Sequence, residues 1–177
     1  MISLSSLLGL GLWMSVASPS AASDGAEARA WLERQSVERD CRELHKLSAV
    51  QRAWINLLAE VKGRKVDRLR AVEILGACDP TEAARARLAR VLHGDQPLEI
   101  QQAAASAIAQ GWPALATPLL DVSLQGSPHP EVRAHVALTL GSLEQEEAIT
   151  ALRGRLKLEP DHTVKDAIRL ALRKASG

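Results

Sequence analysis

The sequence predicts an all-α fold: a right-handed α-solenoid of about four antiparallel helical hairpins followed by a C-terminal capping helix. The main observation is a repeat of 32 residues, which holds apolar residues in register over most of the chain. The clearest columns are Ile100, Val132 and Val164; Ala104, Val136 and Ile168; Ala84, Ala116 and Ala148; Leu88, Leu120 and Leu152. A fixed period of this length is typical of stacked supersecondary units.

Composition supports this prediction. Aromatic residues make up 2% of the chain, with neither Phe nor Tyr, so the core has to be built from Leu, Ala, Val and Ile. Ala and Leu are strong helix formers, and small side chains let helices pack closely. The net charge is +1, with 22 basic and 21 acidic residues. This balance argues against a nucleic-acid or anionic-membrane partner, because neither would meet an attractive global field.

The N-terminal segment resembles an export signal. Residues 1–23 carry no charged side chain, and an apolar run from Leu4 to Val16 leads into Ser20-Ala-Ala22. An apolar core that ends in small residues predicts a cleaved signal peptide and a periplasmic or secreted protein. The run is too short to span a bilayer, and we expect no stable membrane span in the protein after cleavage. A buried N-terminal helix is the alternative, although the segment has no polar face.

Two N-terminal helices should form a capping hairpin over residues 24–63. The first is expected over residues 27–46, with Trp31, Cys41 and Leu44 buried. Ser48 and Gln51 form a capping box that opens the second helix, whose apolar positions follow one face. This hairpin departs most from the repeat, as a terminal cap does.

Repeating helices should fill residues 64–177. One is expected over residues 66–77, and the next begins around Asp79-Pro80, with Asp79 as its cap. The following helices should begin near Leu98, Pro113, Pro130, Glu146 and Thr163. Each pair is a hairpin that buries its apolar stripe only by stacking on its neighbours.

The two cysteines, Cys41 and Cys78, predict a disulfide, because an even count in an exported chain favours pairing. The first and third helices run parallel in an up-down-up array, so both thiols should lie at one edge of the stack. Two buried free thiols are the alternative.

The stretch Pro130-Glu-Val-Arg-Ala-His-Val-Ala-Leu-Thr-Leu-Gly141 resembles the first helix of a HEAT-like repeat, of the short type named after the phycobilisome lyases. Thr163–Leu172 is similar with Lys165 in the Arg position, and Glu99–Ile108 is a weaker copy with Gln101 there. The resemblance implies the fold, while members of such a family perform many functions. Bilin lyases are cytoplasmic, and an export signal disagrees with that branch. Deoxyhypusine hydroxylases use His-Glu pairs, and none of the five histidines here precedes a Glu.

No catalytic motif, cofactor site or metal-spaced cluster is visible in the sequence, so we expect no catalytic residues, no cofactor and no metal. His129 and His162 occupy matching loops and could share a metal, although they also fit as helix-start residues. Candidate binding residues are Trp112, at a hairpin turn, and a discontinuous basic surface on the second helices of the hairpins. That surface would involve Arg85, Arg90, Arg153 and Lys157.

The sequence therefore predicts a non-enzymatic module for protein binding or scaffolding, whose partner is another protein of the envelope or the extracellular space. The alternative is a lyase-like accessory factor or an enzyme of the HEAT-like family. A structural part of an envelope complex is a third interpretation, and it would require an exposed apolar patch.

Overall fold

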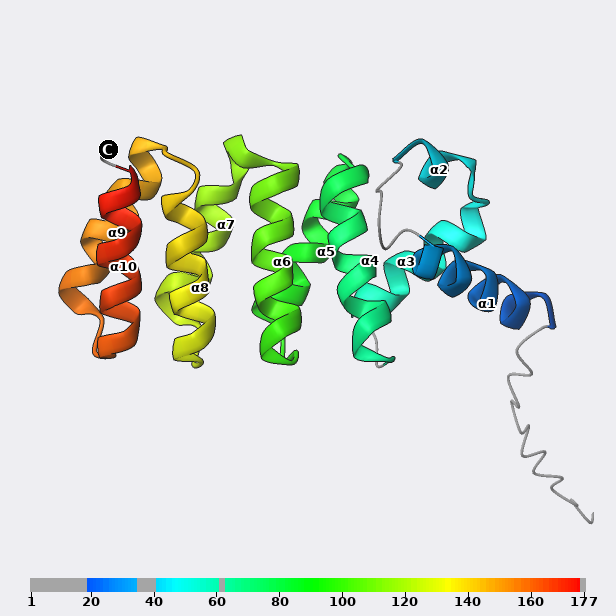
Figure 1. Ribbon diagram of the computed structural model, residues 1–177, viewed down its shortest axis with the longest axis horizontal. Helices are drawn as coiled ribbons and strands as arrows, with labels where there is room; N and C mark the ends of the chain where they lie inside the picture. The colour runs from blue at the N-terminus through cyan, green and yellow to red at the C-terminus, as the bar shows by residue number, and fades with distance from the viewer. Residues whose placement is uncertain (1–18, 35–40, 61–62, 176–177) are drawn as a thin grey trace, which may run out of the picture.

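The computed structural model describes residues 19–34, 41–60 and 63–175 of the chain, and all regular structure in these residues is helical. The helices are α1 (Pro19–Arg34), α2 (Cys41–Lys46), α3 (Ala49–Glu60), α4 (Lys65–Cys78), α5 (Glu82–His93), α6 (Leu98–Gly111), α7 (Pro113–Gly126), α8 (Pro130–Gly141), α9 (Glu146–Leu158) and α10 (His162–Ala175). Helices α4, α6, α8 and α10 form one layer, and α5, α7 and α9 pack behind them (Figure 1). The predicted all-α solenoid is confirmed.

The core follows the repeat columns. On the first helices of the hairpins, one repeat column is fully buried: Ile100, Val132 and Val164. On the second helices, another column is fully buried: Leu88, Leu120 and Leu152. Each residue of a column faces the neighbouring unit, so one hydrophobic core runs along the stack. The 32-residue period of the sequence therefore reflects the burial of the same positions in each stacked unit.

The N-terminal cap differs from the prediction. The single helix expected over residues 27–46 is two helices, α1 and α2, and residues 35–40 between them lie outside the described residues. Trp31 and Leu44 are buried as expected. Most of the predicted signal peptide, residues 1–18, also lies outside the described residues, while residues 19–23 begin α1. Among the described helices, none has both the length and the apolar character needed to cross a membrane.

Helix starts are set by short-range hydrogen bonds. The backbone N–H of Gln51 donates to Ser48 Oγ at 3.1 Å, and the backbone N–H of Ser48 donates to Gln51 Oε1 at 3.0 Å, so the predicted capping box is confirmed. The cap of α5 is Thr81, whose Oγ1 accepts from the Ala84 N–H at 3.2 Å. Asp79 was expected in that role, but its carboxylate accepts from the Thr81 N–H and forms the turn before the helix.

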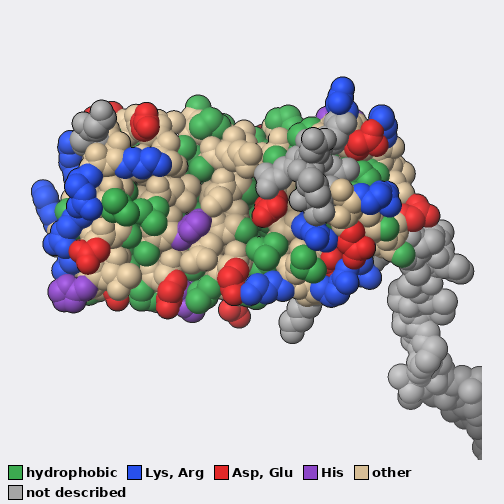
Figure 2. Space-filling view, viewed as in Figure 1, with side chains coloured by type: hydrophobic (Ala, Val, Ile, Leu, Met, Phe, Trp, Pro, Cys, Tyr) green, Lys and Arg blue, Asp and Glu red, His purple; other side chains and the backbone are tan. Residues whose placement is uncertain are grey.

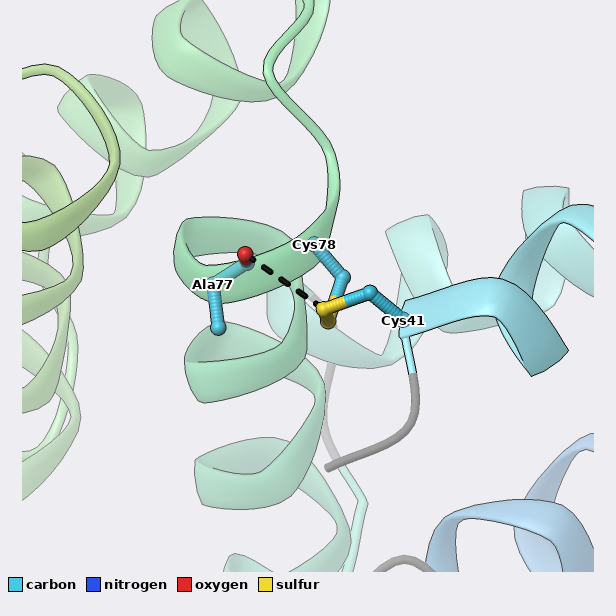
Figure 3. Close-up of a disulfide and its surroundings, with 3 residues drawn as sticks. All are labelled: Cys41, Ala77 and Cys78. Atoms are coloured by element: carbon cyan, nitrogen blue, oxygen red, sulfur yellow. Dashed lines mark hydrogen bonds between the residues drawn. A yellow bond between two sulfur atoms is a disulfide. The ribbon is translucent and has the colours of Figure 1, made fainter. Parts of the chain in front are cut away.

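Cys41 and Cys78 form a disulfide, with 5.0 Å between their Cα atoms (Figure 3). It fastens the short helix α2 to the end of α4, and Cys41 Sγ lies 3.6 Å from the Ala77 carbonyl oxygen. The sequence separation is 37 residues, for which the chain-entropy model gives a stabilisation of about 4 kcal/mol. The predicted pairing is thus present in the structure.

Candidate functional site

The spacing between first-layer helices depends on two small residues. A Cβ placed on Gly76 of α4 would lie 2.6 Å from the Ala107 Cβ of α6, and one on Gly141 of α8 would lie 2.6 Å from the Ala171 Cβ of α10. Glycine therefore permits close approach at α4–α6 and at α8–α10.

The α6–α8 junction lacks this glycine contact. The residues in the corresponding positions are Ala109 and Thr139, allowing for one extra residue in the α4–α5 connection. Their larger side chains hold the two helices apart and line an open groove of about 370 Å³. The groove is further lined by Ser106, Gln110, Pro113, Ser142 and Leu143. Figure 2 shows few charged side chains at the centre of this face, with Lys and Arg gathered toward its two ends.

A serine and a histidine meet beside this groove. Ser106 Oγ of α6 lies 2.8 Å from His135 Nε2 of α8, within hydrogen-bond distance. One repeat later the same positions hold Leu138 and Ala167, which are both apolar. Ser106 is exposed and His135 is partly buried, which leaves the hydroxyl open to the groove.

Burial sets the charge of the imidazole. Desolvation lowers the pKa of His135 from its ordinary value, and a smaller opposing effect comes from a hydrogen bond with the backbone of Gln102. The ring is therefore neutral near pH 7 and has one nitrogen free to accept a proton. A hydroxyl hydrogen bonded to a neutral imidazole is the arrangement that activates a serine nucleophile.

This pair was not predicted from the sequence. Ser106 and His135 are 29 residues apart and match no motif. Comparison of the repeat columns would have given a signal. Two polar residues stand where the next unit has two apolar ones, and such local departures from a consistent pattern concentrate at functional sites.

The predicted basic surface is divided in the structure. On α5, Arg90 pairs with Glu60 at 2.8 Å, and Arg85 lies 3.7 Å from Glu82. On α9, Arg153 lies 3.8 Å from Glu146, and Lys157 is exposed. A groove between α7 and α9 includes three acidic residues in its lining, Asp121, Glu146 and Glu147. The four cations therefore do not form one continuous basic groove.

Trp112 is buried rather than presented to solvent, with 9% of its surface exposed. Its indole Nε1–H donates to the Pro80 carbonyl oxygen at 3.2 Å, so the side chain joins the α6–α7 turn to the α4–α5 turn. This contact closes the hairpins against each other. Within the described residues, Trp112 does not come together with the four candidate basic residues.

His129 and His162 are the two histidines that the sequence placed in matching loops. In the described part of the chain, no cluster of three or more His, Cys, Asp or Glu residues is arranged to hold an ion. His129 caps the start of α8, and His162 is the first residue of α10. Both therefore occupy the helix-start positions that the sequence allowed for them.

A buried ionic network joins α8, α9 and the turn that follows α9. Glu159 accepts from Arg133 Nη2 at 2.7 Å and Nε at 3.0 Å, and from Arg155 Nε at 2.8 Å. The backbone N–H of Asp161 also donates to Glu159 at 3.0 Å. Burial alone raises the pKa of Glu159, but these hydrogen bonds and charges outweigh it and lower the pKa to about 2. The network holds α8 and α9 together and is satisfied within the protein.

The comparisons with known proteins agree with the architecture. Residues 88–173 match the family described as HEAT repeats, which supports a HEAT-like repeat architecture. No curated protein matches the chain in sequence. Among solved structures, human deoxyhypusine hydroxylase in complex with glycerol is similar, with a TM-score of 0.59 and 22% identity. The similarity covers 80% of this chain and 45% of that one, so the chain spans less than half of the enzyme.

This comparison corrects the functional prediction. The prediction of a non-enzymatic scaffold is wrong against this finding, because the solved structure that shares the fold is an enzyme. The prediction rested on the absence of a sequence motif. In a solenoid, residues from separate repeats meet at a helix junction, so a catalytic arrangement needs no local motif. At this identity the likeness concerns the fold alone, and chemistry has to be argued from the site.

Proposed function

We propose that this chain is an exported HEAT-like enzyme that catalyses acyl transfer, with Ser106 as nucleophile and His135 as general base. The observation that carries the proposal is the 2.8 Å contact between Ser106 Oγ and His135 Nε2 beside an open groove. Nucleophile and base within hydrogen-bond reach are the first requirement for covalent catalysis by serine.

The proposed reaction conserves atoms and charge. Ser106 Oγ attacks the carbonyl carbon of an ester or thioester, a C–O bond forms, and the hydroxyl proton passes to His135 Nε2. The imidazolium then donates this proton to the leaving oxygen or sulfur as its bond to carbon breaks. Water, activated by His135, hydrolyses the acyl-serine. Gln110 lines the groove and supplies an amide donor close to the site.

The open groove favours a substrate carried on another protein. It is lined along both α6 and α8 and is not enclosed, so an extended segment can lie in it. We propose a protein of the envelope or the extracellular space as the partner, and a role as an accessory enzyme of the lyase-like kind. Charged side chains are few at the centre of this face, which suits an acylated or otherwise apolar segment better than a highly charged one.

Reaction with a fluorophosphonate probe tests the proposal. The wild-type protein should be labelled at pH 8, and Ser106→Ala should reduce labelling to background, because the attacking hydroxyl is removed. His135→Gln should lower the labelling rate by at least about 100-fold, since general base catalysis contributes about this much or more. Ser48→Ala is the matched control, because this serine caps α3 outside the groove. Labelling at background in the wild type, or equal labelling of Ser106→Ala, would refute the assignment.

We further propose that residues 1–23 direct export and are removed. The disulfide supports this, because such bonds persist in oxidising compartments. Full-length protein expressed in a secreting host should be recovered outside the cytosol, beginning at Ser23 or Asp24, with an unreduced mass that corresponds to paired cysteines. Recovery from the cytosol with residue 1 in place and both thiols reduced would contradict export.

A further inference from the structure

A second hollow lies at the opposite end of α6 from the Ser106 groove. This cavity, of about 340 Å³, sits between the α5–α6 and α7–α8 connections. Its polar lining comprises His93, Asp95, Gln101, Ser123, Ser127 and His129. Gln101 and Ser123 are almost fully buried, at 4% and 3% exposure, so the polar lining reaches into the body of the protein.

The repeat register explains why space remains here. One unit later, the positions of Gln101, Ser123 and Ser127 are held by Arg133, Arg155 and Glu159. Those three side chains fill the corresponding volume with the buried ionic network described above. Gln101, Ser123 and Ser127 are shorter and uncharged, so the unit with the cavity has neither the cations nor the anion of that network.

The hydrogen-bonding partners of the missing groups remain in place. In the next unit, Arg155 Nη1 of α9 donates to the Gln125 carbonyl oxygen at 3.3 Å, and Gln125 lies near the end of α7. There the Asp161 N–H donates to the Glu159 carboxylate, and Asp161 corresponds to His129. In the cavity the His129 N–H reaches only Ser127 Oγ, at 3.3 Å. The end of a second-layer helix thus offers carbonyl oxygens, and the start of α8 offers an N–H donor.

We propose that this cavity binds a small zwitterion, an α-amino acid, which replaces the missing ion pair. Its cationic group lies at the end of α5 and against the Asp95 carboxylate. Its carboxylate lies at the start of α8, where the His129 N–H and the Ser127 hydroxyl donate to it. The two ends of the ligand would meet different parts of the lining, and recognition of both charges would give the site its selectivity. The inference is independent of the acyl-transfer proposal.

The gain from matching both charges can be measured by calorimetry. We would titrate the mature protein with L-arginine, L-lysine, L-glutamate and glycine, and with agmatine, which is arginine without its carboxylate. At least one amino acid should bind, and agmatine should bind at least about tenfold more weakly than arginine. Ser106→Ala should bind the amino acid as the wild type does, which separates this site from the catalytic groove.

Two variants fill the cavity in different ways. Gln101→Arg/Ser123→Arg/Ser127→Glu installs the residues of the next unit and should abolish binding while keeping the helical fold. Ser123→Leu fills part of the space without adding charge and should weaken binding by at least about tenfold. Absence of binding by every amino acid tested, equal binding of agmatine and arginine, or unchanged binding in a folded cavity-filled variant would each overturn the proposal.

Discussion

Replacing Glu159 with Gln should lower the free energy of unfolding by about 3 to 5 kcal/mol, which is typical when one partner of a buried ion pair is removed. The side chain of Glu159 is fully buried, and those of Arg133 and Arg155 are 9% and 13% exposed. Gln keeps the shape of the side chain but not its charge. Two guanidinium groups would then remain buried without a counter-charge. Urea unfolding at pH 7, followed by circular dichroism, measures the loss.

The same network should make the wild-type protein sensitive to acid. The pKa of Glu159 falls from 4.5 to about 2 on folding, so the folded state binds this proton less tightly than the unfolded state. The stabilisation is fully present above pH 4.5 and is lost as the pH falls toward 2. A shift of this size corresponds to about 3 kcal/mol. The difference in stability between wild type and Glu159→Gln should therefore shrink as the pH falls through this window.

Glu146→Gln is the matched control for this pair of experiments. Its side chain is 80% exposed and lies 3.8 Å from Arg153, an arrangement that contributes about 0 to 1 kcal/mol. It should leave both the stability at pH 7 and the acid profile nearly unchanged. Equal effects of Glu146→Gln and Glu159→Gln would show that the buried network does not stabilise the fold.

The architecture was predictable because each repeat column obeys one physical requirement. Val132, for example, is apolar for the same reason as Ile100 and Val164, since each faces the next unit and is fully buried. The disulfide was predicted from the even number of cysteines in a chain expected to be exported, and the expected helix order supported the pairing. Two separate helices, α1 and α2, were not predicted, because residues 27–46 contain no Pro or Gly that would divide one helix.

The candidate sites were not predicted, because they arise where columns stop matching. Ser106 and His135 are ordinary residues in their own helices, and only the register of α6 against α8 brings them together. The cavity is lined by Ser123 and Ser127 at positions where the next unit has the larger, paired side chains of Arg155 and Glu159. Conversely, Arg90 looked free in the sequence, but it acquires an acidic neighbour from another helix, Glu60 of α3.

Close helix contact makes a second strong prediction, at Gly76. An added methyl group there would lie 2.6 Å from both the Cβ and the carbonyl oxygen of Ala107, and 2.7 Å from its Cα. Backbone atoms cannot rotate out of the way, so α4 and α6 would have to separate. Gly76→Ala should therefore lower the free energy of unfolding by about 2 kcal/mol, despite the better helix propensity of alanine. Thermal and urea unfolding would measure this.

Gly154 provides the opposite case in the same protein. It lies inside α9, and a Cβ added there would have no neighbour within 4 Å. Gly154→Ala should raise the free energy of unfolding by about 0.5 to 1 kcal/mol, because only the backbone entropy term remains. A glycine is thus required where first-layer helices touch and is merely tolerated on the open face of α9. Stabilisation by both substitutions would mean that α4 and α6 have room to spare. The explanation of the α6–α8 groove by Ala109 and Thr139 would then fail as well, because it depends on the same contact distance.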